Sequence, residues 1–222
     1  NTTGCQNTAI GAFTLFDVTT GCQNVGVGYG SGANITTGVC NTAIGHNSFN
    51  TATTGDNNVA VGREALYANT TADNSTALGF QSLKANTTGA ENTAVGAFGL
   101  TANTTGTLNT AVGFGSLQAN TTGSNNSALG CGSLQANTTG IRNTAVGNQS
   151  SDANTTGQCN VTMGHDSFST NTTGSSNVAI GADALYSSTT SSNNVAVGKS
   201  ALALNTTGTQ NVAVGRNAGD AN

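Results

Sequence analysis

Side chains able to do acid–base chemistry are few in this chain of 222 residues. The two histidines, His46 and His165, lie far apart in the sequence, and Asp166 follows His165 directly. A histidine beside a carboxylate can act as a general base when a nucleophile faces it, but an adjacent surface pair is more commonly solvated. The phosphate-binding G-x-x-x-x-G-K-[ST] pattern and the calcium-binding nonapeptide are both missing from the sequence. We therefore expect no enzyme, no cofactor and no metal site.

The five cysteines are the other reactive group. Cys5 and Cys22 are separated by one period of the repeat that runs through the chain, and Cys40 comes one position later in the following period. If residues one period apart lie in neighbouring strands, their Cα atoms are about 5 Å apart, within disulfide range. The spacing is compatible with a Cys5–Cys22 disulfide, with free thiols or interchain links as the alternatives. Because five is odd, at least one thiol stays free or pairs with another chain.

Asn-X-Ser/Thr sequons offer sites for N-linked sugars. Asparagine is also a natural corner residue and threonine can bond the turn backbone, so the same letters have a structural explanation. Sugars on every sequon would be crowded about 5 Å apart. We therefore expect sparse glycosylation at most. The candidate asparagines in one register of the chain are Asn69, Asn86, Asn103, Asn120, Asn137, Asn154, Asn171 and Asn205.

All of these residues belong to one sequence repeat. The motif Asn-[Thr/Val]-Ala-[Val/Ile]-Gly ends at Gly11 and recurs at intervals of 17 up to Gly215, which gives thirteen units and one further residue. Numbering positions within the unit from 1 to 17, positions 2 and 3 are always Thr and position 11 is always Gly. The sequence predicts a single repeat domain over residues 1–222. Because Asn222 would begin a fourteenth unit, we expect this domain to be a fragment of a longer fibre.

The unit predicts an all-β fold. The segment at positions 8–10 favours a short strand, a second strand is expected around positions 14–17, and Asn and Gly supply the corners. Each unit is then one coil of a parallel β-solenoid, or β-roll, of thirteen 17-residue coils. We expect the aliphatic position 10 and the Leu-rich position 15 to form the core, with Ala at position 9 in a lateral contact. The core column would include Val61, Val95, Val112, Val146, Val197 and Val214.

Charge excludes two classes of partner. Charged residues make up 6% of the chain, and five Lys and Arg residues cannot neutralise a nucleic-acid backbone. No apolar run approaches the ~18 residues of a membrane span, so we expect no membrane insertion of this segment. All charged residues fall at positions 5, 6, 12, 13, 16 or 17, which predicts that these positions face solvent.

The unit N-T-A-V-G-x-x-A-L-x-A-N-T-T-G resembles two related groups of repeats. One is the left-handed parallel β-roll in the heads of trimeric autotransporter adhesins. The closer resemblance is to the NTTG…NTAxGxxAL repeats of predicted bacterial surface and phage-tail-fibre-like proteins. This resemblance implies a left-handed coil, an extracellular, cell-surface or virion location, and a trimeric fibrous stalk or head.

The expected function is a structural component of an extracellular fibre or surface appendage, acting as a stalk, a spacer or an adhesin head. Self-association into a homotrimer or an end-to-end filament is expected, with surface glycans as a further partner. The alternative is a glycan- or ice-binding module that presents repeated Thr and Asn columns. The aromatic residues at positions 12, 13 and 16 do not form one continuous stripe, which favours a spacer: Tyr29, Tyr67, Phe80, Phe98, Phe114 and Tyr186.

Overall fold

The computed structural model describes residues 2–220. The regular secondary structure of these residues consists of β-strands that are three residues long. No helix in this part of the chain has the length and apolar character needed to cross a membrane. The strands are β1 (Thr8–Ile10), β2 (Val25–Val27), β3 (Thr42–Ile44), β4 (Val59–Val61), β5 (Thr76–Leu78), β6 (Thr93–Val95), β7 (Thr110–Val112), β8 (Ser127–Leu129), β9 (Thr144–Val146), β10 (Val161–Met163), β11 (Val178–Ile180), β12 (Val195–Val197) and β13 (Val212–Val214).

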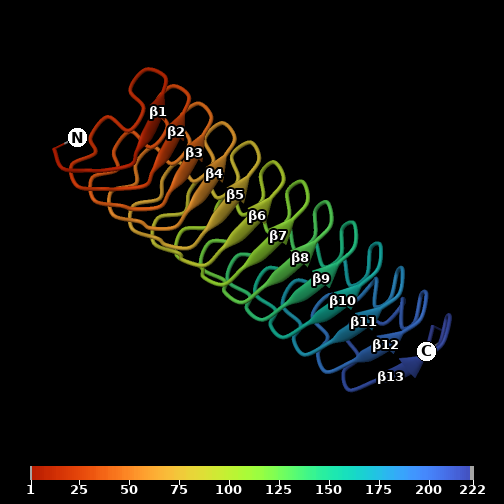
Figure 1. Ribbon diagram of the computed structural model, residues 1–222. Helices are drawn as coiled ribbons and strands as arrows, with labels where there is room; N and C mark the ends of the chain where they lie inside the picture. Colours follow the sequence, from red (N-terminus) through yellow and green to blue (C-terminus); the bar gives the residue numbers. More distant parts are fainter. Residues whose placement is uncertain (1, 221–222) are drawn as a thin grey trace. The chain divides into compact units, whose positions relative to one another are not determined.

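The chain divides into two compact units, Asn1–Asn109 with β1–β6 and Thr110–Asn222 with β7–β13. Within each unit every strand pairs in parallel with the next, and the register always shifts by one repeat, as in Thr8↔Val25 and Ser127↔Thr144. Successive coils therefore lie directly above one another within a unit (Figure 1). Each unit is a β-solenoid, which confirms the predicted fold class.

The second half of each coil is turn rather than strand, so the prediction of a second strand around positions 14–17 was wrong. Positions 13 and 15 have a left-handed backbone, for example Glu64 with φ 57° and Leu66 with φ 49°. Position 6 is also left-handed, as at Asn57 with φ 58°. Strands need negative φ throughout, so the chain bends at these residues and the coil closes.

Coils are joined by backbone hydrogen bonds along most of their path. The Thr8 N–H donates to the Asn24 carbonyl at 2.8 Å, and the Gly28 N–H donates to the Ile10 carbonyl at 2.8 Å. The position-2 threonine adds a side-chain bond, because the Thr19 hydroxyl donates to the Thr36 carbonyl at 3.0 Å. The same bond recurs in both units, which explains why this position is always Thr.

The core lies on the opposite face of the strand from the predicted one. Position 9 is buried from β2 to β13, whereas position 10 is half-buried or exposed in every strand. The predicted column fails accordingly: Val61, Val95, Val112, Val146 and Val197 are half-buried and Val214 is exposed. The reason is space, since so short a coil encloses room for alanine beneath the strand and for little more. At Gly26 even a Cβ would approach Thr14 Cγ2 to 2.5 Å.

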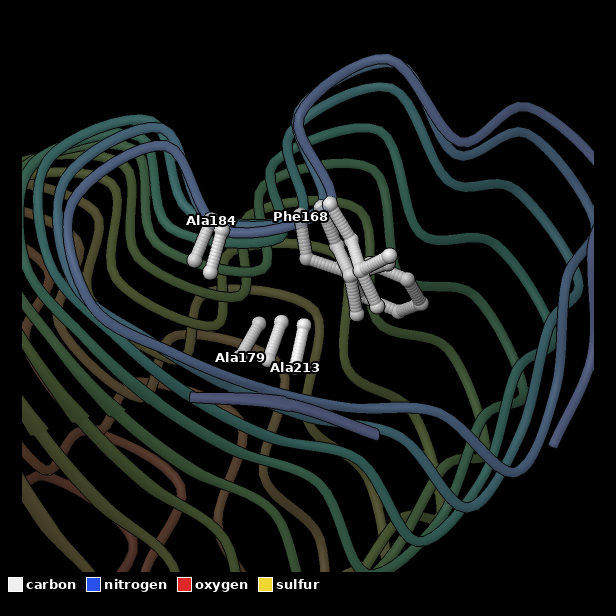
Figure 2. Packing of buried hydrophobic residues seen from close by; sticks show 8 residues of the cluster. Phe168, Ala179, Ala184 and Ala213 are labelled. Carbon is white, nitrogen blue, oxygen red and sulfur yellow. The ribbon is translucent and has the colours of Figure 1, made fainter. Parts of the chain in front are cut away.

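Among residues 2–220, large apolar side chains enter the core from position 15 and, at Val18 and Ile35, from position 1. The predicted Leu column at position 15 is confirmed as buried, and Phe49 and Phe168 replace leucine there. Figure 2 shows the second unit, where Ala179 and Ala213 line the strand side and Phe168 and Ala184 line the opposite wall. Each coil therefore contributes about one large apolar side chain, and stability has to come from stacking many coils.

Two buried asparagine ladders complete the interior. At position 7, the side-chain oxygen of Asn24 accepts the Asn41 N–H at 3.0 Å, while its amide donates to the Gly38 carbonyl at 2.8 Å. At position 1, the Asn103 amide donates to Asn86 Oδ1 at 2.8 Å and to the Gly106 carbonyl at 3.0 Å. These ladders satisfy the corner backbone, which would otherwise be buried without partners.

Candidate functional surfaces

The described residues form no pocket. Three surface features stand out: the outer face of the strands, a run of planar side chains in the first unit, and a small cluster of charged residues around Glu64.

The outer strand face consists of positions 8 and 10 of every coil. It is made of Thr, Ser, Val, Ile, Leu and Met and contains no charged residue. None of these side chains is buried, and several large ones are well exposed, such as Leu78 at 46% and Leu129 at 51%. Within each unit this face is therefore free of charge, with an aliphatic or Met column at position 10 and a mixed Val, Thr and Ser column at position 8.

The planar stripe is a run of side chains at positions 12 and 13 of the first unit: Phe13, Tyr29, His46, Arg63, Phe80 and Phe98. The Tyr29 ring lies 5.5 Å from Phe13 and stacks on His46 at 5.4 Å, centroid to centroid. Further along, the Arg63 guanidinium lies over Phe80 at 5.8 Å, and Phe80 meets Phe98 at 5.2 Å.

This arrangement agrees with the prediction that the aromatic rings form no continuous stripe, because the ring contacts fall into two groups, Phe13–Tyr29–His46 and Phe80–Phe98. The phenyl and phenol rings alone are interrupted, but His46 and Arg63 supply planar groups in the two coils between Tyr29 and Phe80. One planar side chain then stands in each of six consecutive coils. Of the other predicted aromatic residues, Tyr67 and Tyr186 lie at position 16, and Phe114 lies at position 12 of the second unit.

The charge cluster centres on Glu64. Its carboxylate contacts Lys84 Nζ at 2.7 Å and Arg63 at 3.3 Å, and it accepts a hydrogen bond from Gln81 at 2.8 Å. The hydrogen bonds from Lys84 and Gln81 lower the pKa of Glu64 to about 2. Two cations thus share one carboxylate beside the planar stripe.

This lowered pKa predicts a pH-dependent contribution to stability. A carboxyl group whose pKa is about 2 when folded and 4.5 when free stabilises the fold above pH ~4.5 and loses that effect as pH falls through ~2. Lys84→Gln should therefore lower the free energy of unfolding at pH 6 by at most about 1 kcal/mol, and this difference should shrink as pH falls from ~4.5 towards ~2. Denaturant melts of both proteins at each pH measure the difference. The exposed Lys199 provides the control, because Lys199→Gln should show no such trend.

His165 and Asp166 form the expected solvated pair, with Nδ1 and Oδ2 3.1 Å apart. Asp183, at position 13 of the following coil, joins them, and one possible ligand atom from each residue lies within 4.8 Å of the others. The sequence had not suggested this grouping, because the two aspartates become neighbours only when the coils stack. His46 takes no part in it and stacks on Tyr29 instead.

All five cysteines are free thiols, so the Cys5–Cys22 disulfide is not formed in the structure. The predicted neighbourhood is nevertheless present, because the Cys5 N–H donates to the Cys22 sulfur at 3.1 Å. A side-chain hydrogen bond with Cys22 is the main cause that raises the pKa of the Cys5 thiol. The Cys40 thiol points to a different partner and donates to Gln23 Oε1 at 3.2 Å.

The position-1 sequons are unsuitable for glycosylation in the folded chain. Their side chains lie in the buried ladder described above, and, except at Asn171, the amide that would carry the sugar already donates to a carbonyl at the coil corner. Seven of the eight predicted sites are buried: Asn69, Asn86, Asn103, Asn120, Asn137, Asn154 and Asn171. The eighth, Asn205, is half-buried and its amide donates to the Gly208 carbonyl at 3.0 Å.

The Thr and Asn columns of the predicted binding module are mostly internal. Both asparagine ladders are largely buried, and the position-2 hydroxyls bond the next coil. Only the position-3 threonines, such as Thr88 and Thr139, present exposed side chains throughout both units. Comparisons of this chain with protein-family models, with curated proteins and with solved structures find no match.

Proposed function

We propose that this chain is a structural segment of an extracellular fibre or surface appendage, in which solenoids associate side by side. The observation that carries this proposal is the outer strand face. In each unit it runs without a charged residue through all the stacked coils, and its aliphatic side chains are half-buried or exposed. Such a face contributes most to stability when another apolar surface covers it.

A second copy of the chain is the natural cover for this face. The interior of each coil is thin, so lateral contacts add the apolar burial that a single solenoid lacks. Every coil presents the same two columns at the same spacing of about 4.8 Å, and ridges on one copy can then fit between ridges on another at every step. The resemblance of the repeat to trimeric adhesin heads and fibre proteins supports three copies around one axis and a location at a cell or virion surface.

Charged substitutions on the outer strand face test the proposal. Val112→Asp combined with Val146→Asp should convert a wild-type oligomer into a monomer, because each new carboxylate would be buried without a partner in the interface. Light scattering after size-exclusion chromatography gives the mass. Both valines point away from the coil interior, so the circular dichroism of the variant should stay that of the wild type.

Ser175→Asp is the matched control. In the wild type, the Ser175 hydroxyl accepts the Gln158 N–H at 3.0 Å. Asp56, which also lies at position 5 of its repeat, accepts the Val39 N–H in the same way, so this position accommodates an aspartate. This variant adds charge on another surface and should keep the oligomer. A monomeric wild type at micromolar concentration would refute the proposal, as would an unchanged mass after both valine substitutions.

A further inference from the structure

We propose that the planar stripe of the first unit is a binding site for an extended neutral glycan. Phe13, Tyr29, His46, Arg63, Phe80 and Phe98 form this stripe. The proposal is independent of lateral association, because the stripe occupies positions 12 and 13 and the outer strand face occupies positions 8 and 10.

Aromatic rings of the stripe are exposed to solvent, and the stacking of the coils does not require rings at these positions. Tyr29 is 51% exposed and Phe13 is 56% exposed, while the core takes its aromatic residues at position 15. Position 12 holds alanine at Ala182, in a coil of the second unit that has Asp183 at position 13, so a coil can stack without a ring at either position. Large aromatic side chains left in water at a position that accepts alanine indicate a surface that binds something.

The chemistry of the stripe fits the faces of sugar rings. Aromatic faces are electron-rich and attract electropositive groups, and the C–H groups on the face of a pyranose are such groups. One planar side chain per coil offers a contact about every 4.8 Å along the stack. A chain of linked sugars can occupy several of these contacts at once, so weak single contacts combine into useful affinity.

Polar groups beside the rings suit sugar hydroxyls. Asn47 follows His46 at position 13, and its side chain leans over Gly30, where a Cβ would collide with Asn47 Oδ1. The glycine thus leaves room for an amide next to Tyr29. Glu64 offsets one of the two positive charges of Arg63 and Lys84, so one net positive charge remains there, and the salt dependence of binding separates a neutral glycan from an anionic one. The net charge of −4 disfavours nucleic acid, which also stacks on rings.

Affinity electrophoresis tests the proposal. The full chain is run in native gels that contain hydroxyethyl cellulose, xylan or mannan, with polygalacturonate as the anionic comparison. At least one neutral polymer should retard the wild type, and about 1 M salt should leave the retardation unchanged, because screening weakens only charge contacts. Tyr29→Ala combined with Phe80→Ala should weaken the apparent affinity about tenfold or more.

Tyr186→Ala is the matched control. Tyr186 is a ring of similar exposure, 43%, that lies in the second unit and outside the stripe, so this variant should bind as the wild type does. Light scattering of all variants should give the same mass, which separates a loss of glycan binding from a loss of self-association. The proposal is overturned if no neutral polymer retards the wild type, if only polygalacturonate does so and salt abolishes the effect, or if Tyr186→Ala is equally impaired.

Discussion

Gly147→Ala is expected to lower the free energy of unfolding by about 3 kcal/mol or more. The residue has φ 135°, a conformation that costs an L-amino acid about 1–3 kcal/mol. A Cβ there would also lie 2.5 Å from the Gly164 carbonyl oxygen of the next coil, and overpacking of this kind costs about 1–3 kcal/mol more. Because the opposing atoms are backbone, the coils themselves would have to move apart. Denaturant unfolding followed by circular dichroism measures the loss.

Gly215→Ala separates the two causes. Gly215 has nearly the same backbone, φ 127°, but the nearest atom to an added Cβ is Ala218 Cβ at 3.9 Å. Only the conformational cost remains, so this variant should lose clearly less stability than Gly147→Ala. Equal losses from the two substitutions would show that the contact between coils is not what requires glycine at position 11.

Asn143→Leu is expected to lower the free energy of unfolding because it removes two buried hydrogen bonds at once. Asn143 Oδ1 accepts the Asn160 N–H at 3.0 Å and its amide donates to the Gly157 carbonyl at 2.8 Å, both inside the coil. Leucine would leave the buried Asn160 N–H without its partner, at a cost of about 1–3 kcal/mol. The Gly157 carbonyl would lose its shorter bond but would still accept from the Asn154 amide at 3.2 Å, so its loss should cost less. The same unfolding measurement gives the change.

Asn143→Ser is the milder companion to this variant. Serine occurs naturally in the same ladder at Ser75, where its hydroxyl accepts the Asn92 N–H at 3.3 Å. Serine at residue 143 should preserve the bond to Asn160 and lose the bond to Gly157, whose carbonyl still accepts from Asn154, so only the smaller part of the destabilisation should remain. If serine and leucine were equally harmful, the side-chain volume of asparagine rather than its hydrogen bonds would explain the ladder.

The repeat predicts the coil, but it does not show which strand face points inward. Alternation requires that positions 8 and 10 share one face and position 9 the other, and hydrophobicity then favours the valine face as core. Side-chain size carries the correct signal. Position 9 stays small, from Gly26 to Thr162, as a confined interior requires, whereas position 10 varies from Val61 to Met163, as an open surface allows.

The turns were harder to predict than the strand. Leucine disfavours positive φ, so a leucine-rich position 15 indicates a strand when read alone. In the structure, Leu117 pays this conformational cost at φ 50° while its side chain is fully buried and its N–H donates to the Ser133 carbonyl at 3.0 Å. Burial and a coil-to-coil bond offset a local preference, and neither is visible from one unit of the sequence.

The planar stripe was missed for a different reason. A search for aromatic letters finds Tyr29 and Phe80 as isolated rings three coils apart. Their connection depends on His46 and Arg63, whose side chains are usually assessed for charge and catalysis rather than for planarity. Positions 12 and 13 taken together as columns, with every planar group counted, contain the signal.

The direction of the coil-to-coil hydrogen bonds determines how each unit responds to force. These bonds point along the stacking direction. A load that pulls neighbouring coils apart would therefore break the bonds of one coil before those of the next. Each released coil would lengthen the chain by about 60 Å at full extension. Under tension such a unit would lengthen in equal steps, with each remaining coil still folded, and would take up sudden strain without breaking as a whole.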